Sequence, residues 1–283
     1  MGKYEIETGL LLRNSLLLNS VLTSIEVKIG LKSEQISLLE KVDEYLLRRM
    51  LKAHSKVPIE SLYLATGAVP IKYIIMQRRL NYLHHILTRD SKELISRVYF
   101  AQKRKPIADD WFWMSENDKK QCYINLTNGD IKCMKKNRFK ILVKTKIRKL
   151  AFENLVKIKS KHSKGEEVQY DVLQSQKYLV SEKFTTKQKQ LLFSLRFRMI
   201  NVKSNFKIMY ENLMCLLCEE EEETQSHLLD CQKLIDNCQE LYNDDKIKYE
   251  DLYDDKKQID VTVLYEKILQ TRDRLIKEKE TQN

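Results

Sequence analysis

Apolar residues recur at steps of three and four along most of the chain, which is the period of an amphipathic helix. In residues 10–50 this pattern predicts helix, with one helix starting at Ser33. Further helices are expected over residues 71–89, 91–102, 139–159, 186–200 and 261–279. The apolar stripe of the 139–159 segment is formed by Phe139, Leu142, Val143, Ile147, Leu150, Ala151, Leu155 and Ile158.

Turn-forming residues are scarce, which favours the same fold class. The chain has 283 residues, of which six are glycine and three are proline, well below average usage. Asn128-Gly129 is typical of a tight hairpin turn and predicts two short strands around residues 123–126 and 131–134. Trp111 and Trp113 are expected to anchor their segment on the core. The expected fold is therefore mainly α, an irregular multi-helix bundle.

Four candidate metal ligands follow one another near the C-terminus, namely Cys215, Cys218, His227 and Cys231. The first two form a C-x₂-C pair, and the last two stand four residues apart, so they share one face if that segment is helical. Three thiolates and an imidazole suit a tetrahedral Zn²⁺ ion. We therefore predict a small CCHC zinc-binding module with Zn²⁺ as its cofactor. Buried cysteines that only fill the core are the alternative, and Cys238 is a spare donor.

Charge is distributed unevenly along the chain. Residues 1–214 hold 41 Lys or Arg against 21 Asp or Glu, whereas residues 215–283 hold 10 against 19. Residues 132–164 alone carry 13 basic residues and one acid, Glu153. Such a density is typical of a surface that binds a polyanion, most often nucleic acid, although a solvated charged face is the alternative. The candidate contacts to the backbone phosphates of RNA or DNA are Arg78, Arg79, Lys144, Lys146, Arg148, Lys149, Arg196 and Arg198.

The sequence also bears on membranes and compartment. No stretch is long and apolar enough to be expected to span a membrane, so no membrane partner is predicted. The leucine-rich residues 9–18 are interrupted by Arg13 and preceded by acidic residues, which argues against a signal peptide. Four of the six cysteines lie within residues 215–238 and do not resemble a disulfide framework. An intracellular location, nuclear or cytoplasmic, is expected.

Several phrases of the sequence share their order with a known family. They are LLEKVDEYLLRR at residues 38–49, PIESLYLATG at 58–67, RRLNYL at 78–83 and ETQSHLLDC at 223–231. In this order they resemble the region downstream of the polymerase palm in LINE-type non-LTR retrotransposon reverse transcriptases, from about residue 10 to residue 231. The resemblance implies a thumb, a helical connector and a CCHC zinc knuckle that help to hold template RNA and primer DNA.

The expected domains follow the pattern of charge and the resemblance together. Residues 1–115 would form a thumb-like helical region and residues 116–210 a basic helical connector. Residues 211–240 would form the CCHC zinc knuckle, and residues 241–283 an acidic C-terminal helical tail.

The catalytic aspartates of a reverse transcriptase are not found at a suitable place. Such an enzyme needs an aromatic-x-Asp-Asp hairpin whose carboxylates hold two metal ions. The string IADD at residues 107–110 lacks the aromatic residue, and YNDD at 242–245 follows the knuckle. We therefore expect a non-catalytic, zinc-stabilised fragment that binds the template/primer backbone. Two alternatives stay open: a protein-interaction or structural relic that uses the acidic tail, and an accessory part of a longer reverse transcriptase polyprotein.

Overall fold

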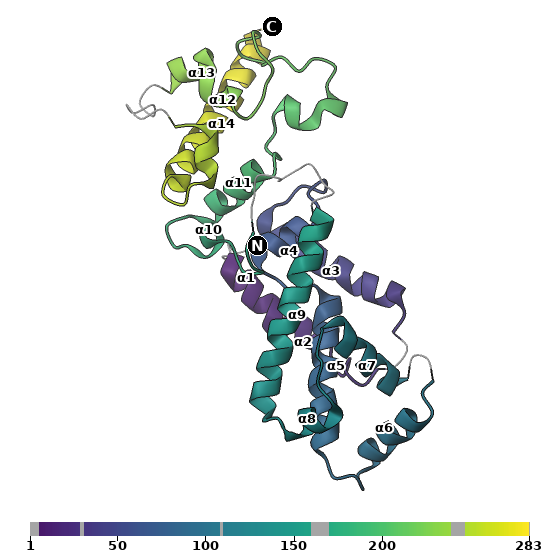
Figure 1. Cartoon of the computed structure of the whole chain (residues 1–283). Coiled ribbons are helices and arrows are strands. Elements are labelled where there is room, and N and C mark those ends of the chain that lie inside the picture. The colour runs from purple at the N-terminus through teal and green to yellow at the C-terminus, as the bar shows by residue number, and fades with distance from the viewer. Residues whose placement is uncertain (1–5, 29–30, 108–109, 160–169, 239–246, 283) are drawn as a thin grey trace.

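The chain folds into a set of helices, as the computed structural model in Figure 1 shows. The structure describes residues 6–28, 31–107, 110–159, 170–238 and 247–282. Apart from two isolated β-bridges, the regular elements in these ranges are helical, so the expectation of a mainly α fold is confirmed. The first half contains α1 (Ile6–Leu12), the π-helical turn η1 (Arg13–Leu17), α2 (Leu18–Val21), α3 (Ser33–Leu51), α4 (Ile59–Thr66), α5 (Ile71–Thr88), α6 (Leu94–Arg104), α7 (Trp111–Gln121) and α8 (Asn128–Cys133).

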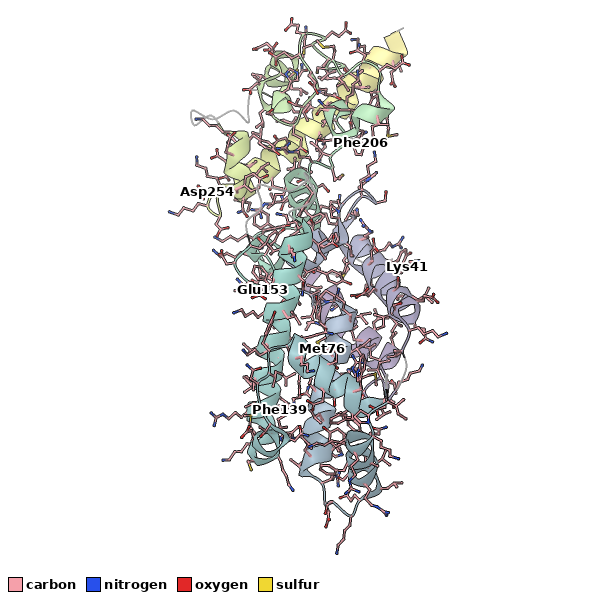
Figure 2. All side chains as sticks on the ribbon, turned by 45° about the vertical axis from the view of Figure 1, so that its right-hand side comes forward. Lys41, Met76, Phe139, Glu153, Phe206 and Asp254 are labelled. Atoms are coloured by element: carbon pink, nitrogen blue, oxygen red, sulfur yellow. The ribbon has the colours of Figure 1, made fainter. Side chains whose placement is uncertain are left out.

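The second half begins with the longest helix of the basic region, α9 (Lys136–Lys159), which runs beside α5 and α4. Its fully buried apolar residues follow a strict four-residue step: Phe139, Val143, Ile147, Ala151 and Leu155. The stripe is narrower than the sequence predicts, because Leu142 and Leu150 are only half-buried and Ile158 is exposed. Figure 2 shows Phe139 near one end of α9 and Glu153 toward the other. Most of the surface of this helix is therefore free for its cationic side chains.

An ion pair lies in the interior between η1, α3 and α4. Arg13 donates from Nε to Asp43 Oδ1 at 2.5 Å and from Nη2 to Asp43 Oδ2 at 2.6 Å. The exposed fractions of the two side chains are 1% and 0%. Tyr63 donates its hydroxyl to the same carboxylate at 3.0 Å, and burial beside Asp43 raises the pKa of Tyr63. The pair joins the first helical segment to the rest of the bundle.

Two local expectations need correction. Residues 10–50 are not one continuous helical segment, since α1, η1 and α2 end at Val21, although α3 does begin at Ser33. The hairpin predicted at Asn128-Gly129 is wrong: the two residues open α8. Thr127 caps this helix, because its hydroxyl accepts from the Asp130 N–H at 3.1 Å while Asp130 accepts from the Thr127 N–H at 2.9 Å. A reciprocal capping box therefore outweighs the turn preference of the dipeptide.

Trp111 anchors α7 as expected. Its ring is buried, and its Nε1–H donates to the Glu26 carbonyl at 2.7 Å. Trp113, in contrast, is 43% exposed. Among the described residues no single helix has the length and apolar character to span a membrane. Taken together, α4 and α5 have that length and apolar character, but the chain bends by 57° between them.

The C-terminal part is built around the last helix, α14 (Gln258–Gln282). It packs against α11 (Thr186–Arg196), α12 (His227–Asp230), α13 (Gln232–Asn237) and the 3₁₀ helix η4 (Tyr249–Tyr253). Its inner face, Val261, Leu264, Tyr265 and Ile268, belongs to the same hydrophobic core as α9. The remaining elements are α10 (Lys177–Val180) and the 3₁₀ helix η2 (Lys203–Met209). Residues 258–282 are thus a packed helix that supports the segment of the four candidate ligands.

Candidate metal centre

Cys215 and Cys218 lie on a loop that is closed by short antiparallel pairing. The Cys215 N–H donates to the Glu221 carbonyl at 2.7 Å, and the Glu223 N–H donates to the Leu213 carbonyl at 2.8 Å. Glu219 turns the chain with a positive φ of 59°, and its N–H returns to the Cys215 carbonyl at 3.0 Å. The C-x₂-C segment is therefore folded back on itself, so that both thiols point to one side.

The other two ligands come from the single turn α12. His227 is its first residue, and Cys231 directly follows the last. The Thr224 hydroxyl accepts from the His227 N–H at 2.9 Å and fixes the start of the turn. As predicted from the four-residue spacing, imidazole and thiol face the same way. The ligand atoms of Cys215, Cys218, His227 and Cys231 all lie within 4.8 Å of one another.

The imidazole is oriented by a carboxylate behind it. His227 Nδ1 lies 3.0 Å from Glu221 Oε2, and Nε2 lies 3.4 Å from Cys218 Sγ. A histidine that ligates a metal through one ring nitrogen commonly donates from the other to a carboxylate, which fixes its tautomer. Glu221 is 71% exposed, so it supplies this contact from the surface.

The thiols differ in their proton affinity. Burial by itself would raise the pKa of Cys218, but the backbone N–H groups of Glu220 and Glu221, with Cys215 and His227, lower it to about 7. Burial raises the pKa of Cys215, and it raises that of Cys231 to about 12. Three thiols lie close together in a place sheltered from water. As thiolates they would repel one another, and a bound cation would remove this repulsion. This group is thus suited to hold a metal ion.

The spare donor Cys238 does not join the cluster. It is buried, and its Sγ–H donates to Thr271 Oγ1 at 3.3 Å, which ties α13 to α14. Cys122 is buried beside Met76 and Cys133 is exposed.

A second buried ion pair joins α14 to residues 215–223, the loop that carries Cys215 and Cys218 and is called the ligand loop below. Glu223 is fully buried and accepts from Arg272 Nη2 at 2.8 Å and Nε at 2.9 Å. Its other carboxylate oxygen accepts from the Lys203 N–H at 3.0 Å. Glu223 is the last of five consecutive glutamates at residues 219–223, a run that resembles a solvated acidic stretch. This last glutamate is nevertheless an interior residue.

Four of the predicted phosphate contacts are engaged inside the protein. Arg78 donates to the Leu22 carbonyl at 2.7 Å, and Arg79 pairs with Asp118 at 2.7 Å. Arg148 donates to the Leu173 carbonyl, and Arg196 to the Leu252 carbonyl at 2.9 Å. These guanidinium groups hold distant segments together, a role that the sequence pattern did not separate from surface binding.

The other candidates lie nearer to solvent. Lys144, Lys149 and Arg198 are exposed, and Lys146 is half-buried. Lys149 lies 3.9 Å from Glu153, its neighbour one helical turn on. Arg198 adopts a positive φ of 51° just after α11. The accessible part of the predicted set is therefore Lys144 and Lys149 on α9 together with Arg198 just after α11.

Two further lysines of α9 were not singled out from the sequence. Lys136 and Lys140 are exposed and precede Lys144 at the same four-residue step as the buried stripe. Lys140 and Lys144 directly follow Phe139 and Val143 of the buried stripe, and Lys136 continues their four-residue step toward the N-terminus, so the spacing of the stripe was the signal that could have found them. Lys136 also lines a hollow with His85 and Arg89. The pKa of His85 is lowered by burial and then by these two cations, which indicates a positive field there.

Comparison of the chain with protein-family models, with curated proteins and with solved structures found no match.

Proposed function

We propose that the protein is a zinc-stabilised, nucleic-acid-binding protein that contacts the backbone of RNA or DNA through α9. The observation that carries this proposal is the exposed row Lys136, Lys140 and Lys144 on a helix whose only acidic residue is Glu153. Cations in such a row would displace condensed counterions from a polyanion without reading its sequence. Half-buried His85 and exposed Arg89 lie beside Lys136 at the start of α9, although Glu93 pairs with Arg89 at 3.6 Å and offsets part of this charge.

Zn²⁺ is the proposed ion because of the donor set. Three sulfurs and one imidazole nitrogen favour a borderline-soft ion with tetrahedral geometry, and four protein ligands leave no open position for catalysis. The role proposed for the ion is therefore structural.

Binding of Zn²⁺ is expected to release protons and to strengthen as pH rises from 6 to 8. At neutral pH Cys215 and Cys231 hold their protons, since burial raises the pKa of both thiols. The ion must displace these protons and the part of the Cys218 proton that is still bound near its pKa of about 7, so release of about two to three protons per ion is expected. Titration calorimetry in buffers of different ionisation enthalpy measures this number. An affinity that does not change between pH 6 and 8 would contradict the thiolate ligation.

The proposed activity is binding rather than catalysis. Asp110, the described aspartate of the IADD string, caps α7 by accepting from the Trp113 N–H at 2.7 Å. Asp109 and the YNDD string at residues 242–245 lie outside the described residues. The relation to the thumb, connector and knuckle of LINE-type reverse transcriptases stays a prediction from the sequence.

The competing proposal is a relic in which the acidic C-terminal end docks on the basic middle. That arrangement would place α14 against α9. The main contacts of α14 are instead with α11, α12, α13 and η4. An intramolecular role for the acidic end therefore receives less support than binding through α9.

Replacing Lys136, Lys140 and Lys144 together by Gln is expected to weaken nucleic-acid binding about tenfold or more at low salt. The slope of log affinity against log salt concentration should decrease in magnitude by about two to three, because each lost phosphate contact removes nearly one released counterion. Fluorescence anisotropy with labelled single-stranded and duplex RNA and DNA measures both quantities.

The matched control replaces Lys183, Lys187 and Lys256, which are also exposed, by Gln. Both variants lose the same charge, so a general electrostatic effect would weaken them equally. Equal weakening, or no binding by the wild type at low salt, would refute the assignment to α9.

A further inference from the structure

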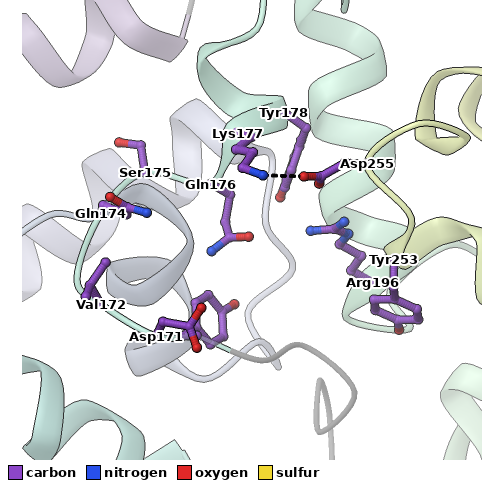
Figure 3. A pocket seen from close by; sticks show the side chains of 11 residues that line it. Asp171, Val172, Gln174, Ser175, Gln176, Lys177, Tyr178, Arg196, Tyr253 and Asp255 are labelled. Atoms are coloured by element: carbon purple, nitrogen blue, oxygen red, sulfur yellow. Dashed lines mark hydrogen bonds and ion pairs between the residues drawn. The ribbon is translucent and has the colours of Figure 1, made fainter.

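A polar cavity of about 460 Å³ lies between residues 170–178, the end of α11 and η4. Figure 3 shows its lining, with Arg196 entering from one side and Gln176 from the other. The volume is within the range typical of small-molecule sites. The cavity is separate from the metal centre and from the exposed face of α9, so an inference about it stands apart from the proposed function.

Arg196 is a buried cation that forms no ion pair with a carboxylate of the described residues. Its side chain is 5% exposed and lies between the rings of Tyr178 and Tyr253, 4.8 Å and 5.6 Å from their centroids. Nε and Nη2 both donate to the Leu252 carbonyl. In the part of the chain that the structure describes, no carboxylate lies within 4.0 Å of the guanidinium. Asp255, which lines the same cavity, pairs with Lys177 at 2.5 Å, and the pKa of Asp255 is lowered mainly by Lys177 and also by Arg196. Charged groups this deeply buried are normally paired.

The cavity also holds polar groups that the described part of the fold does not use. The Tyr170 hydroxyl is buried and has no hydrogen-bond partner there. The Gln176 amide and the Tyr178 hydroxyl point into the open space beside the Arg196 guanidinium. Buried polar groups without partners cost free energy unless a ligand or water satisfies them. Three neutral hydrogen-bonding groups around one buried cation that has no direct ion pair form a receptor for an oxyanion.

We propose that this cavity binds a phosphate group, carried by a small molecule or by the end of a nucleic acid. A tetrahedral phosphate offers acceptors in several directions, which suits donors that come from the separate segments of Tyr170, Tyr178 and Arg196 better than the planar pair of a carboxylate does. Lys177 and Asp255 neutralise each other at the rim, where Asp171 is exposed. The two cations and two carboxylates of the lining balance one another, so the cavity favours ligands with one phosphate over the more highly charged diphosphates and triphosphates.

The test uses the full zinc-loaded chain and titration calorimetry with inorganic phosphate, with chloride at equal ionic strength as the reference. The wild type is expected to bind phosphate saturably, and Tyr170→Phe to bind it about tenfold more weakly, since it loses one hydrogen bond to a charged ligand. Tyr170→Phe removes a hydroxyl that has no hydrogen-bond partner among the described residues, so the thermal stability of this variant should match that of the wild type. Arg196→Gln should abolish binding, but the Leu252 contact means that it can also unfold the protein. Tyr170→Phe is therefore the decisive variant.

Further titrations distinguish whether the phosphate belongs to a small molecule or to the end of a nucleic acid. Tighter binding of adenosine monophosphate than of inorganic phosphate would support a mononucleotide-sized ligand. A preference for a 5′-phosphorylated oligonucleotide over its 5′-hydroxyl form, lost in Tyr170→Phe, would support a nucleic-acid end. The Lys136, Lys140 and Lys144 variant should bind inorganic phosphate as the wild type does, which keeps this test independent of α9. No saturable phosphate binding at millimolar concentration, or equal affinity in Tyr170→Phe, would overturn the proposal.

Discussion

Removal of the metal ion from Cys215, Cys218, His227 and Cys231 is expected to unfold the C-terminal part of the protein. Without the ion, three thiols and an imidazole crowd within 4.8 Å of one another, and the one-turn helix between the last two ligands is too short to be stable alone. In small zinc modules the binding free energy, about 10–16 kcal/mol, supplies most of the folding free energy. The loss should extend to α14, because α12 and α13 pack against it.

Hydrogen exchange with and without a strong chelator measures the extent of this unfolding. Protection is expected to fall in residues 211–238 and 258–282 and to persist in α3, α5 and α9. Cys218→Ser and His227→Ala should reproduce the effect with zinc present, whereas Cys133→Ser, at an exposed cysteine outside the cluster, should not. A wild type that is free of metal after preparation under reducing, zinc-replete conditions, and still fully protected, would disprove the site.

The substitution Asp43→Ala is expected to destabilise the N-terminal bundle by about 3–5 kcal/mol, the usual cost of leaving one member of a buried ion pair alone. Arg13 is 1% exposed, so water cannot replace the lost carboxylate without opening the core. The Tyr63 hydroxyl loses its partner as well. Urea denaturation followed by circular dichroism measures the change in the free energy of unfolding.

Glu44→Ala is the matched control, one residue further along the same helix. Glu44 is 34% exposed and pairs with Arg48 at 2.7 Å one helical turn away, and its removal should cost about 0.3–0.5 kcal/mol. The double variant Arg13→Met/Asp43→Leu should recover part of the loss, because it removes both charges from the interior. Equal stability of Asp43→Ala and Glu44→Ala would show that the pair is not buried in solution.

The helical period predicted most of the long elements. α5, α9 and α14 lie within a few residues of their expected ranges, since each carries repeated apolar residues on one side. The same period did not show which apolar residues would be covered. Leu38 and Val42 fit the helical pattern, yet they are 61% and 48% exposed, while Asp43 beside them is fully buried. Local spacing carries no information about a partner 30 residues away such as Arg13.

The metal ligands could be predicted for a related reason. All four belong to one short segment, so spacing alone determines which atoms meet. The arginines could not be assigned in this way, because their partners are distant in the chain. The partners of Arg78, Arg79 and Arg196 lie 39 to 56 residues away, and the partner of Arg148 lies 25 residues away. The Arg196 cavity had no signal in the sequence, since its lining comes from residues 170–178, from Arg196 and from residues 253–255, which are far apart in the chain.

The ion pair of Glu223 with Arg272 makes metal binding and docking of α14 linked equilibria. Each process strengthens the other by the same factor, because the carboxylate that α14 neutralises belongs to the ligand loop. During synthesis the four ligands leave the ribosome before Arg272 does. The nascent module is therefore expected to hold its ion weakly at first, and to retain it firmly only when the final helix closes over the loop.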